Sequence, residues 1–308
     1  MHVLVTGGCG FIGSNLVHRL VKEDYRVHVL DDLSSGKLDN LKDVLGKIVF
    51  NRIDVTDKTG VEKAVSNVDA IFHLAAQISV NNSIKEPERD AAVNIGGTVN
   101  LLQSSVNFGV KKFIFYSSAA VYGEPSYVPI DEAHPKNPLS PYGQSKLAAE
   151  GYVELYNRLY RLNCAVIRPF NVYGPRQDPK NPYTGVISIF LDKAMNNDDI
   201  PVYGDGLQTR DFIYIDDLVE LSMKILKDES SFRVFNAACG RKISIIKLAE
   251  SIRELTASKS VIIHLPRRGG EIYESYADIE SAENAVGFKP KFTVESGLKE
   301  FIRYLKNR

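Results

Sequence analysis

The sequence has few cysteines, no excess of either charge and no long apolar run. Its 308 residues include only three cysteines, Cys9, Cys164 and Cys239, which are far apart and lack CxxC spacing. This pattern argues against a disulfide framework or a zinc site and favours a reducing cytoplasm. Thirty-eight Lys and Arg balance thirty-eight Asp and Glu. Because no overall field then attracts polyanions, we expect neither nucleic acid nor a membrane surface as a partner.

The sequence shows the pattern of neither a membrane-spanning nor a secreted protein. No apolar stretch is long enough for a transmembrane helix. The N-terminus enters a short apolar strand pattern directly, without the basic and apolar regions of a secretory signal. The chain is 44% hydrophobic and 25% charged, which is ordinary for a soluble globular protein.

In the first half of the chain, short apolar runs alternate with helical patterns. Helices are expected at 12–23, 88–108 and 141–160. Strands are expected at 2–6, 27–31, 47–53, 70–74, 112–117 and 164–168. This alternation predicts an α/β protein with a Rossmann-like, doubly wound parallel sheet, because right-handed crossovers place helices on both faces.

After Pro169 the pattern changes. Residues 171–184 are rich in Pro and Gly and are expected to form a loop. We predict one domain at 1–172, with returning segments near 211–238, and a smaller C-terminal α/β domain at 173–308. The elements expected in this half are helices near 185–196, 216–227, 244–256 and 294–306, and a strand at 232–236.

A glycine turn separates the first strand from the first helix. Gly7, Gly10 and Gly13 have G-x-x-G-x-x-G spacing. Glycine lets the backbone approach a pyrophosphate, which then meets free amides and a helix N-terminus. Asp31 ends the next strand, where a carboxylate accepts hydrogen bonds from ribose hydroxyls and repels a 2′-phosphate. The turn and the acid predict a dinucleotide site that prefers NAD to NADP.

A serine, a tyrosine and a lysine form the candidate catalytic group. Tyr142 and Lys146 are four residues apart after Pro141, so they share one helix face. Ser117 and Ser118 lie at the end of an expected strand, and ligands of doubly wound sheets bind outside the carboxyl ends of strands. A phenol of reference pKa about 10 is a poor base, but a nearby ammonium favours the phenolate. The group therefore predicts removal of a sugar-hydroxyl proton coupled to hydride transfer.

These motifs, with others along nearly the whole chain, resemble the extended short-chain dehydrogenase/reductases, and within them the UDP-glucose 4-epimerases and close UDP-sugar epimerases. The matching stretches are TGGCGFIG (6–13), LDDLSSG (30–36), HLAAQISV (73–80), VNIGGT (93–98), SSAAVYG (117–123), PYGQSK (141–146), RPFNVYGPRQ (168–177), RDFIYIDD (210–217) and RRGGEIYESYAD (267–278). One departure is Asp32, where the family usually has Asn.

The resemblance implies a role for each matched residue. The catalytic residues are Ser118, Tyr142 and Lys146, and no metal is expected. The NAD contacts come from Gly7, Gly10, Phe11, Ile12, Gly13, Asp31, Asp32, Leu33, Ser34, Ser35, Gly36, Asp54, Val55, Leu74, Ala75, Ala76, Gln77, Asn94, Ser117, Tyr142, Lys146 and Phe170. The UDP-sugar contacts come from Ser118, Tyr142, Asn171, Arg210, Arg268, Glu271 and Ser275. We interpret Cys9 and His73 as packed residues rather than catalytic groups.

The implied reaction interconverts UDP-glucose and UDP-galactose through a transient 4-keto sugar. Two alanines, Ala119 and Ala120, stand where the related dehydratases carry an Asp-Glu pair. A methyl group cannot transfer a proton, so dehydration is disfavoured. Three alternatives remain open, namely action on UDP-N-acetylglucosamine and UDP-N-acetylgalactosamine as well, a UDP-glucuronate or UDP-pentose 4-epimerase, and a catalytically idle NAD-binding regulator. The resemblance also implies a homodimer paired through helices 88–108 and 141–160.

Overall fold

The computed structural model describes residues 1–178, 185–230, 232–267, 269–270 and 272–307. The chain divides into two compact units. The first contains residues 1–123, 136–168 and 219–235, and the second contains residues 124–135, 169–218 and 236–308. The predicted Arg268 and Glu271 lie outside the described residues.

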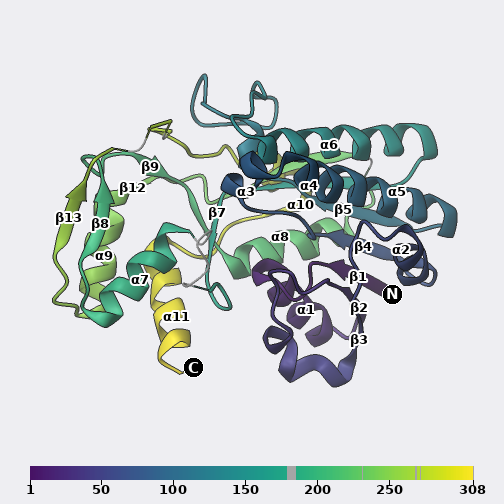
Figure 1. The fold of residues 1–308 in the computed structure, drawn as a ribbon, viewed down its shortest axis with the longest axis horizontal. Coiled ribbons are helices and arrows are strands. Elements are labelled where there is room, and N and C mark those ends of the chain that lie inside the picture. The colour runs from purple at the N-terminus through teal and green to yellow at the C-terminus, as the bar shows by residue number, and fades with distance from the viewer. Residues whose placement is uncertain (179–184, 231, 268, 271, 308) are drawn as a thin grey trace. The chain divides into compact units, whose positions relative to one another are not determined.

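The first unit is built on a seven-stranded sheet of order β11-β6-β5-β4-β1-β2-β3 (Figure 1). The pairs from β3 to β6 are all parallel. The strands are β1 (His2–Thr6), β2 (Arg26–Leu30), β3 (Ile48–Asn51), β4 (Ala70–His73), β5 (Lys112–Tyr116), β6 (Cys164–Pro169) and β11 (Arg233–Ala237). The predicted doubly wound parallel sheet is confirmed, and its order reverses between β1 and β4.

Helices cover both faces of this sheet. On one face α2 (Lys58–Val65), α5 (Gly97–Phe108) and α6 (Pro141–Tyr160) share an apolar core with the strands. The other face carries α1 (Phe11–Lys22) and residues 219–227 of α8 (Ile215–Lys227). An ion pair of 2.9 Å joins Arg19 of α1 to Glu220 of α8.

The predicted helix at 88–108 is interrupted. It consists of α4 (Pro87–Ala91), a π-helical turn η2 (Ala92–Gly96) and α5. In the first unit, the helices that were not predicted are the short ones, namely α2, η1 (Leu38–Lys47), α3 (Val80–Lys85) and η3 (Ala119–Val121). α3 begins because Ser79 caps it, its hydroxyl accepting from Asn82 N at 3.0 Å.

The second unit combines helices with three two-stranded sheets. Its helices α7 (Val186–Asn196), α9 (Ile245–Thr256) and α11 (Val294–Lys306) match the expected ones, and α10 (Glu280–Val286) is additional. The strand pairs are β7 (Asn171–Tyr173) with β10 (Phe212–Tyr214), β9 (Thr209–Arg210) with β12 (Ile243–Ser244), and β8 (Ile200–Tyr203) with β13 (Ile262–Leu265). The segment expected as a loop at 171–184 therefore begins with the strand β7, which is stabilised by pairing with β10. Among the described residues, no helix is long and apolar enough to cross a membrane.

Candidate functional site

The glycine turn lies at the reversal point of the sheet, where ligands of this fold class bind. Gly7 has a φ of +67°, and a Cβ there would lie 2.8 Å from Ala75 N in the loop after β4. A Cβ on Gly13 would lie 2.2 Å from Gly7 O. Only glycine fits both positions, so the turn packs closely against the loop after β4.

The N-terminus of α1 is suited to an anion. The helix begins at Phe11, its N-cap Gly10 has no side chain to cap it, and its first turn contains no acidic residue. The first amides of a helix have no intrahelical partner, and the helix dipole there is positive. The predicted residues Gly10, Phe11, Ile12 and Gly13 therefore fit a dinucleotide pyrophosphate.

Asp31 is fixed beside this turn. Its Oδ2 accepts from Cys9 N at 2.8 Å, and its Oδ1 accepts from Leu33 N at 2.9 Å. Burial raises the pKa of the Asp31 carboxyl, while these two amides oppose that shift. A carboxylate has about four acceptor positions, so Asp31 retains capacity for ribose hydroxyls. A Cβ on Gly36 would lie 3.0 Å from Asp31 Oδ1, so the 31–36 loop folds back on the carboxylate.

Other predicted adenosine contacts have local partners. Asp32 Oδ1 accepts from Ser34 N at 2.9 Å and from Ser34 Oγ at 2.6 Å. Asp54 Oδ1 accepts from Thr56 N at 2.8 Å, and Val55 belongs to the apolar core. Ser35 is exposed. These side chains shape the loops after β2 and β3, at the same end of the sheet as the glycine turn.

The loop after β4 is organised by a buried hydrogen-bond chain. Leu74 N and Ala75 N donate to Thr6 Oγ1 at 3.2 and 3.1 Å. His73 contacts Thr6 Oγ1 at 2.8 Å through Nδ1 and Thr98 Oγ1 at 3.0 Å through Nε2. Because burial lowers the pKa of His73 well below its usual value, the ring is neutral and structural.

The predicted Gln77 and Asn94 are bound to each other. Gln77 N donates to Asn94 Oδ1 at 2.8 Å, and Asn94 Nδ2 lies 3.0 Å from Ser145 Oγ in α6. Asn94 is buried on the π-helical turn, a feature frequent at functional sites. It therefore connects the loop after β4 to α6, and Ala76 lies within that loop.

The predicted catalytic residues are brought together in the first unit. Tyr142 lies in the first turn of α6, whose N-cap Ser140 accepts from Gly143 N at 3.1 Å. A side-chain hydrogen bond joins Tyr142 to Ser118, the N-cap of η3. Lys146 is buried one turn later, with Nζ 4.4 Å from the centroid of the Phe115 ring.

Burial controls the electrostatics of this group. Desolvation raises the pKa of Tyr142, and the hydrogen bond with Ser118 opposes that effect. Desolvation lowers the pKa of Lys146 to about 7, while the negative charges of Glu150 and Asp90 oppose it. Lys146 therefore titrates near neutral pH, where nearby charges decide whether it is an ammonium ion.

Ser117, the remaining predicted residue at the end of β5, has a hydroxyl in need of a partner. Its backbone N donates to Ile167 O at 2.8 Å. Its Oγ is buried and makes no hydrogen bond with any described residue. Buried hydroxyls are normally paired, so a bound ligand is a natural partner.

In the second unit, three predicted substrate residues gather around residues 209–211. Asn171 donates to Asp211 O through its N at 3.2 Å and its Nδ2 at 2.8 Å. Ser275 N donates to Thr209 O at 3.2 Å. Arg210 lies between Thr209 and Asp211 in the sequence, and its Nη1 donates to Thr209 O at 2.8 Å. The predicted Phe170 is buried, and its N donates to Ala237 O at 3.0 Å.

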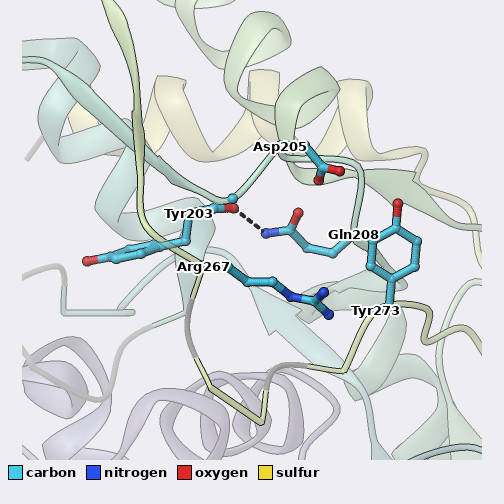
Figure 2. A pocket seen from close by; sticks show the side chains of 6 residues that line it. Tyr203, Asp205, Gln208, Arg267 and Tyr273 are labelled. Carbon is cyan, nitrogen blue, oxygen red and sulfur yellow. Dashed lines mark hydrogen bonds between the residues drawn. The ribbon is translucent and has the colours of Figure 1, made fainter.

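A pocket beside this group was not predicted from the sequence. Figure 2 shows the Gln208 amide, the Arg267 guanidinium and the Tyr273 ring around a common small space. Gln208 Nε2 donates to Tyr203 O at 2.9 Å, and Arg267 lies 5.7 Å from the Tyr273 ring centroid. Tyr203, Gly204 and Asp205 complete the lining. In the sequence, each lining residue lies within eight positions of Arg210 or Ser275.

Known proteins resemble this chain over most of its length. The model of the NAD-dependent epimerase/dehydratase family matches residues 3–238. The UDP-glucose 4-epimerase of Mycolicibacterium smegmatis is 37% identical over 313 residues, covering 100% of this chain and 99% of its own.

Two solved structures resemble the whole chain. The Thermotoga maritima UDP-glucose 4-epimerase, solved with UDP-glucose, has a TM-score of 0.95 at 38% identity and covers 100% of this chain and 99% of its own. The UDP-N-acetylglucosamine 4-epimerase of Methanobrevibacter ruminantium, solved with UDP-N-acetylmuramic acid, has a TM-score of 0.95 at 36% identity. It covers 99% of this chain and 98% of its own.

Proposed function

Because this chain belongs to the NAD-dependent epimerase/dehydratase family, we propose that it is a UDP-hexose 4-epimerase that interconverts UDP-glucose and UDP-galactose. The observation that carries the proposal is the group of Ser118, Tyr142 and Lys146, with Ala119 and Ala120 beside it. In this proposal residues 1–172, with the segment near 211–238, bind NAD, and residues 173–308 bind the UDP-sugar.

The three side chains divide the proton chemistry. Tyr142 takes the proton of the sugar 4-hydroxyl, and Ser118 hydrogen-bonds the same oxygen. Lys146 favours the phenolate while it is an ammonium ion. Bound NAD supplies the acceptor and later donor of hydride at C4. Between these steps the 4-keto sugar turns its other face, so that Tyr142 returns the proton to the inverted alcohol.

The nucleotide of the substrate requires cations and an aromatic pocket. A diphosphate carries about two negative charges, and guanidinium groups recognise phosphate with paired hydrogen bonds. We assign this role to Arg210 and Arg268, and ribose recognition to Glu271. The pocket contains the Tyr273 ring and the Gln208 amide, groups that suit a uracil ring.

The first test removes the proposed base. We expect Tyr142→Phe to lower turnover of UDP-glucose and UDP-galactose by at least about 100-fold, the range of general acid–base catalysis. NAD should remain bound, because the fold of the first unit is unchanged. A panel of UDP-sugars with wild-type protein, read by NMR of the product stereochemistry, identifies the substrate. Full activity of the variant would contradict the assigned base.

The width of the sugar site is set in part by Ser275. A serine leaves room for an acetamido group, so we propose that UDP-N-acetylglucosamine is accepted beside UDP-glucose. Ser275→Tyr should lower kcat/KM for the acetylated sugar by about 10-fold or more while UDP-glucose turnover changes little, because overpacking affects only the larger ligand. Equal losses for both sugars would exclude the space argument.

Two further properties belong to the proposal. The three cysteines are free and buried, which accords with the reducing cytoplasm that we propose as the location. We also propose a homodimer formed through α5 and α6, both of which carry exposed apolar side chains.

A further inference from the structure

Asp90 of α4 is a buried carboxylate whose hydrogen-bond donors are neutral. It is 1% exposed. Its Oδ1 accepts from Gln77 Nε2 at 3.0 Å and from Asn94 Nδ2 at 3.0 Å. Burying a carboxylate is costly unless a cation or several donors compensate it, so two amides alone leave much of this negative charge available to act on its neighbours.

The other acid that acts on Lys146 has a compensating cation of its own. Glu150 Oε1 and Oε2 accept from Arg168 Nε at 2.9 Å and from Arg168 Nη2 at 2.6 Å. Such a bidentate pair compensates part of the charge of both groups. Glu150 acts on Lys146 more strongly than Asp90, but it is held by a cation, whereas the hydrogen-bond donors to Asp90 are neutral.

A short chain of contacts joins Asp90 to the catalytic helix. Asn94 lies 3.0 Å from Ser145 Oγ, and Ser145 Oγ donates to Tyr142 O at 3.0 Å. Ser145 is the residue before Lys146. A change at Asp90 thus reaches the first turn of α6 through Asn94 and Ser145.

We propose that Asp90 is a positioning residue for the epimerisation, a buried anion that holds the Gln77–Asn94–Ser145 contacts and acts electrostatically on Tyr142 and Lys146. The proposal rests on the function proposed above. The negative charge of Asp90 favours the ammonium form of Lys146 and disfavours the phenolate of Tyr142. Both groups therefore titrate at higher pH than they would without Asp90.

The remaining charged groups around α4 are neutral, paired or exposed. His73 beside Lys146 is neutral because its pKa is well below its usual value. Lys85 of α3 and Glu88 of α4 are exposed to solvent. Glu86 and Arg89 form an exposed ion pair of 3.6 Å. Screening by water weakens the effect of exposed charges on a buried pair.

The test is the pH profile of Asp90→Asn. The amide keeps an oxygen to accept from Gln77 and Asn94 but removes the charge. Turnover should rise with deprotonation of Tyr142 and fall with deprotonation of Lys146, so both limbs should move to lower pH by about one unit. At a fixed pH on the alkaline limb, kcat should then be about 10-fold lower than in the wild type.

A purely structural role would lower the amplitude and leave both limbs in place, and that result would overturn the proposal. Asp90→Ser is a second neutral variant that should shift the limbs equally. Asp90→Glu keeps the charge and should keep their positions. Glu88→Gln is the matched control, because it removes one charge from the same helix at an exposed position, and its profile should equal that of the wild type.

A second readout does not depend on the sugar. The near-ultraviolet phenolate absorbance of Tyr142, isolated by subtracting the Tyr142→Phe spectrum, should titrate at lower pH in Asp90→Asn than in the wild type. Absence of turnover with any UDP-sugar would refute the proposed function alone. An unshifted phenolate titration would refute the role of Asp90 alone.

Discussion

Asp211 connects the predicted substrate residues of the second unit. It is fully buried, and its Oδ1 and Oδ2 accept from Cys239 N at 2.8 Å and from Ala277 N at 3.3 Å. Burial raises the pKa of Asp211 to about 6, although these backbone amides oppose the shift. Its carbonyl accepts from Asn171, and Arg210 precedes it in β9. One side chain thus fixes two loops beside the proposed sugar contacts.

Asp211→Asn should destabilise the protein and weaken substrate binding. One carboxylate oxygen becomes an NH2 group that faces a backbone N–H, so the free energy of unfolding should fall by about 1–3 kcal/mol. KM for the UDP-sugar should rise while NAD retention stays constant. Denaturant titrations and steady-state kinetics measure both. Asp198→Asn, at an exposed ion pair with Lys193, is the control and should change stability by less than about 0.5 kcal/mol.

The pH dependence of this effect has a defined sign. Since the folded pKa of Asp211, about 6, lies above its ordinary value of 3.8, folding takes up a proton between these values. Asp211 therefore contributes most stability below about pH 4 and loses it as the pH rises through 6. The stability advantage of wild type over Asp211→Asn should shrink across that window, and a growing advantage would contradict the assignment.

Single residues were predictable where their partners are local in sequence. Tyr142 and Lys146 lie one helical turn apart, and Ser118 follows a strand, so a few residues of context suffice. Asp90 and Asp211 gave no comparable signal. Asp211 accepts hydrogen bonds from the amides of Cys239 and Ala277, which are distant in sequence. A short sequence pattern cannot predict such contacts.

At the scale of elements, the main sheet was predicted because buried parallel strands are continuous apolar runs. The strands β9 and β12 contain two residues each, too few to show any periodicity. The π-helical turn at 92–96 also escaped prediction, since its residues continue the helical pattern on both sides. Its consequence is functional, because it carries the buried Asn94 into contact with Gln77 and Ser145.

At the scale of the whole molecule, a net charge of zero is compatible with positively charged sites at single positions. The proposed ligands are two nucleotide diphosphates, and a helix N-terminus and arginine side chains suffice to bind them without any overall field. The balanced composition excludes attraction to polyanions through bulk charge, but it does not exclude binding of small anionic ligands at local sites.

The apolar surface of the first unit supports the proposed dimer. On α6, Tyr152, Leu159 and Tyr160 are 40%, 61% and 49% exposed, and on α5 Phe108 is 44% exposed. Positions 152, 159 and 160 are separated by seven and eight residues, which places them on one helix face. Exposed large apolar side chains that share a helix face are typical of an interface, and in a two-fold dimer the same face meets its own copy.

Leu159→Glu should therefore convert a dimer into a monomer. In the variant, pairing of the two copies would bury two glutamate carboxylates without partners, which is costly. Light scattering after gel filtration should give a mass near 34.3 kDa for the variant and twice that for the wild type. Val49→Glu, which places the same charge at an exposed position of the edge strand β3, should remain dimeric. A dimeric Leu159→Glu would place the interface elsewhere, because an interface that covers this position of α6 would have to bury two unpaired charges.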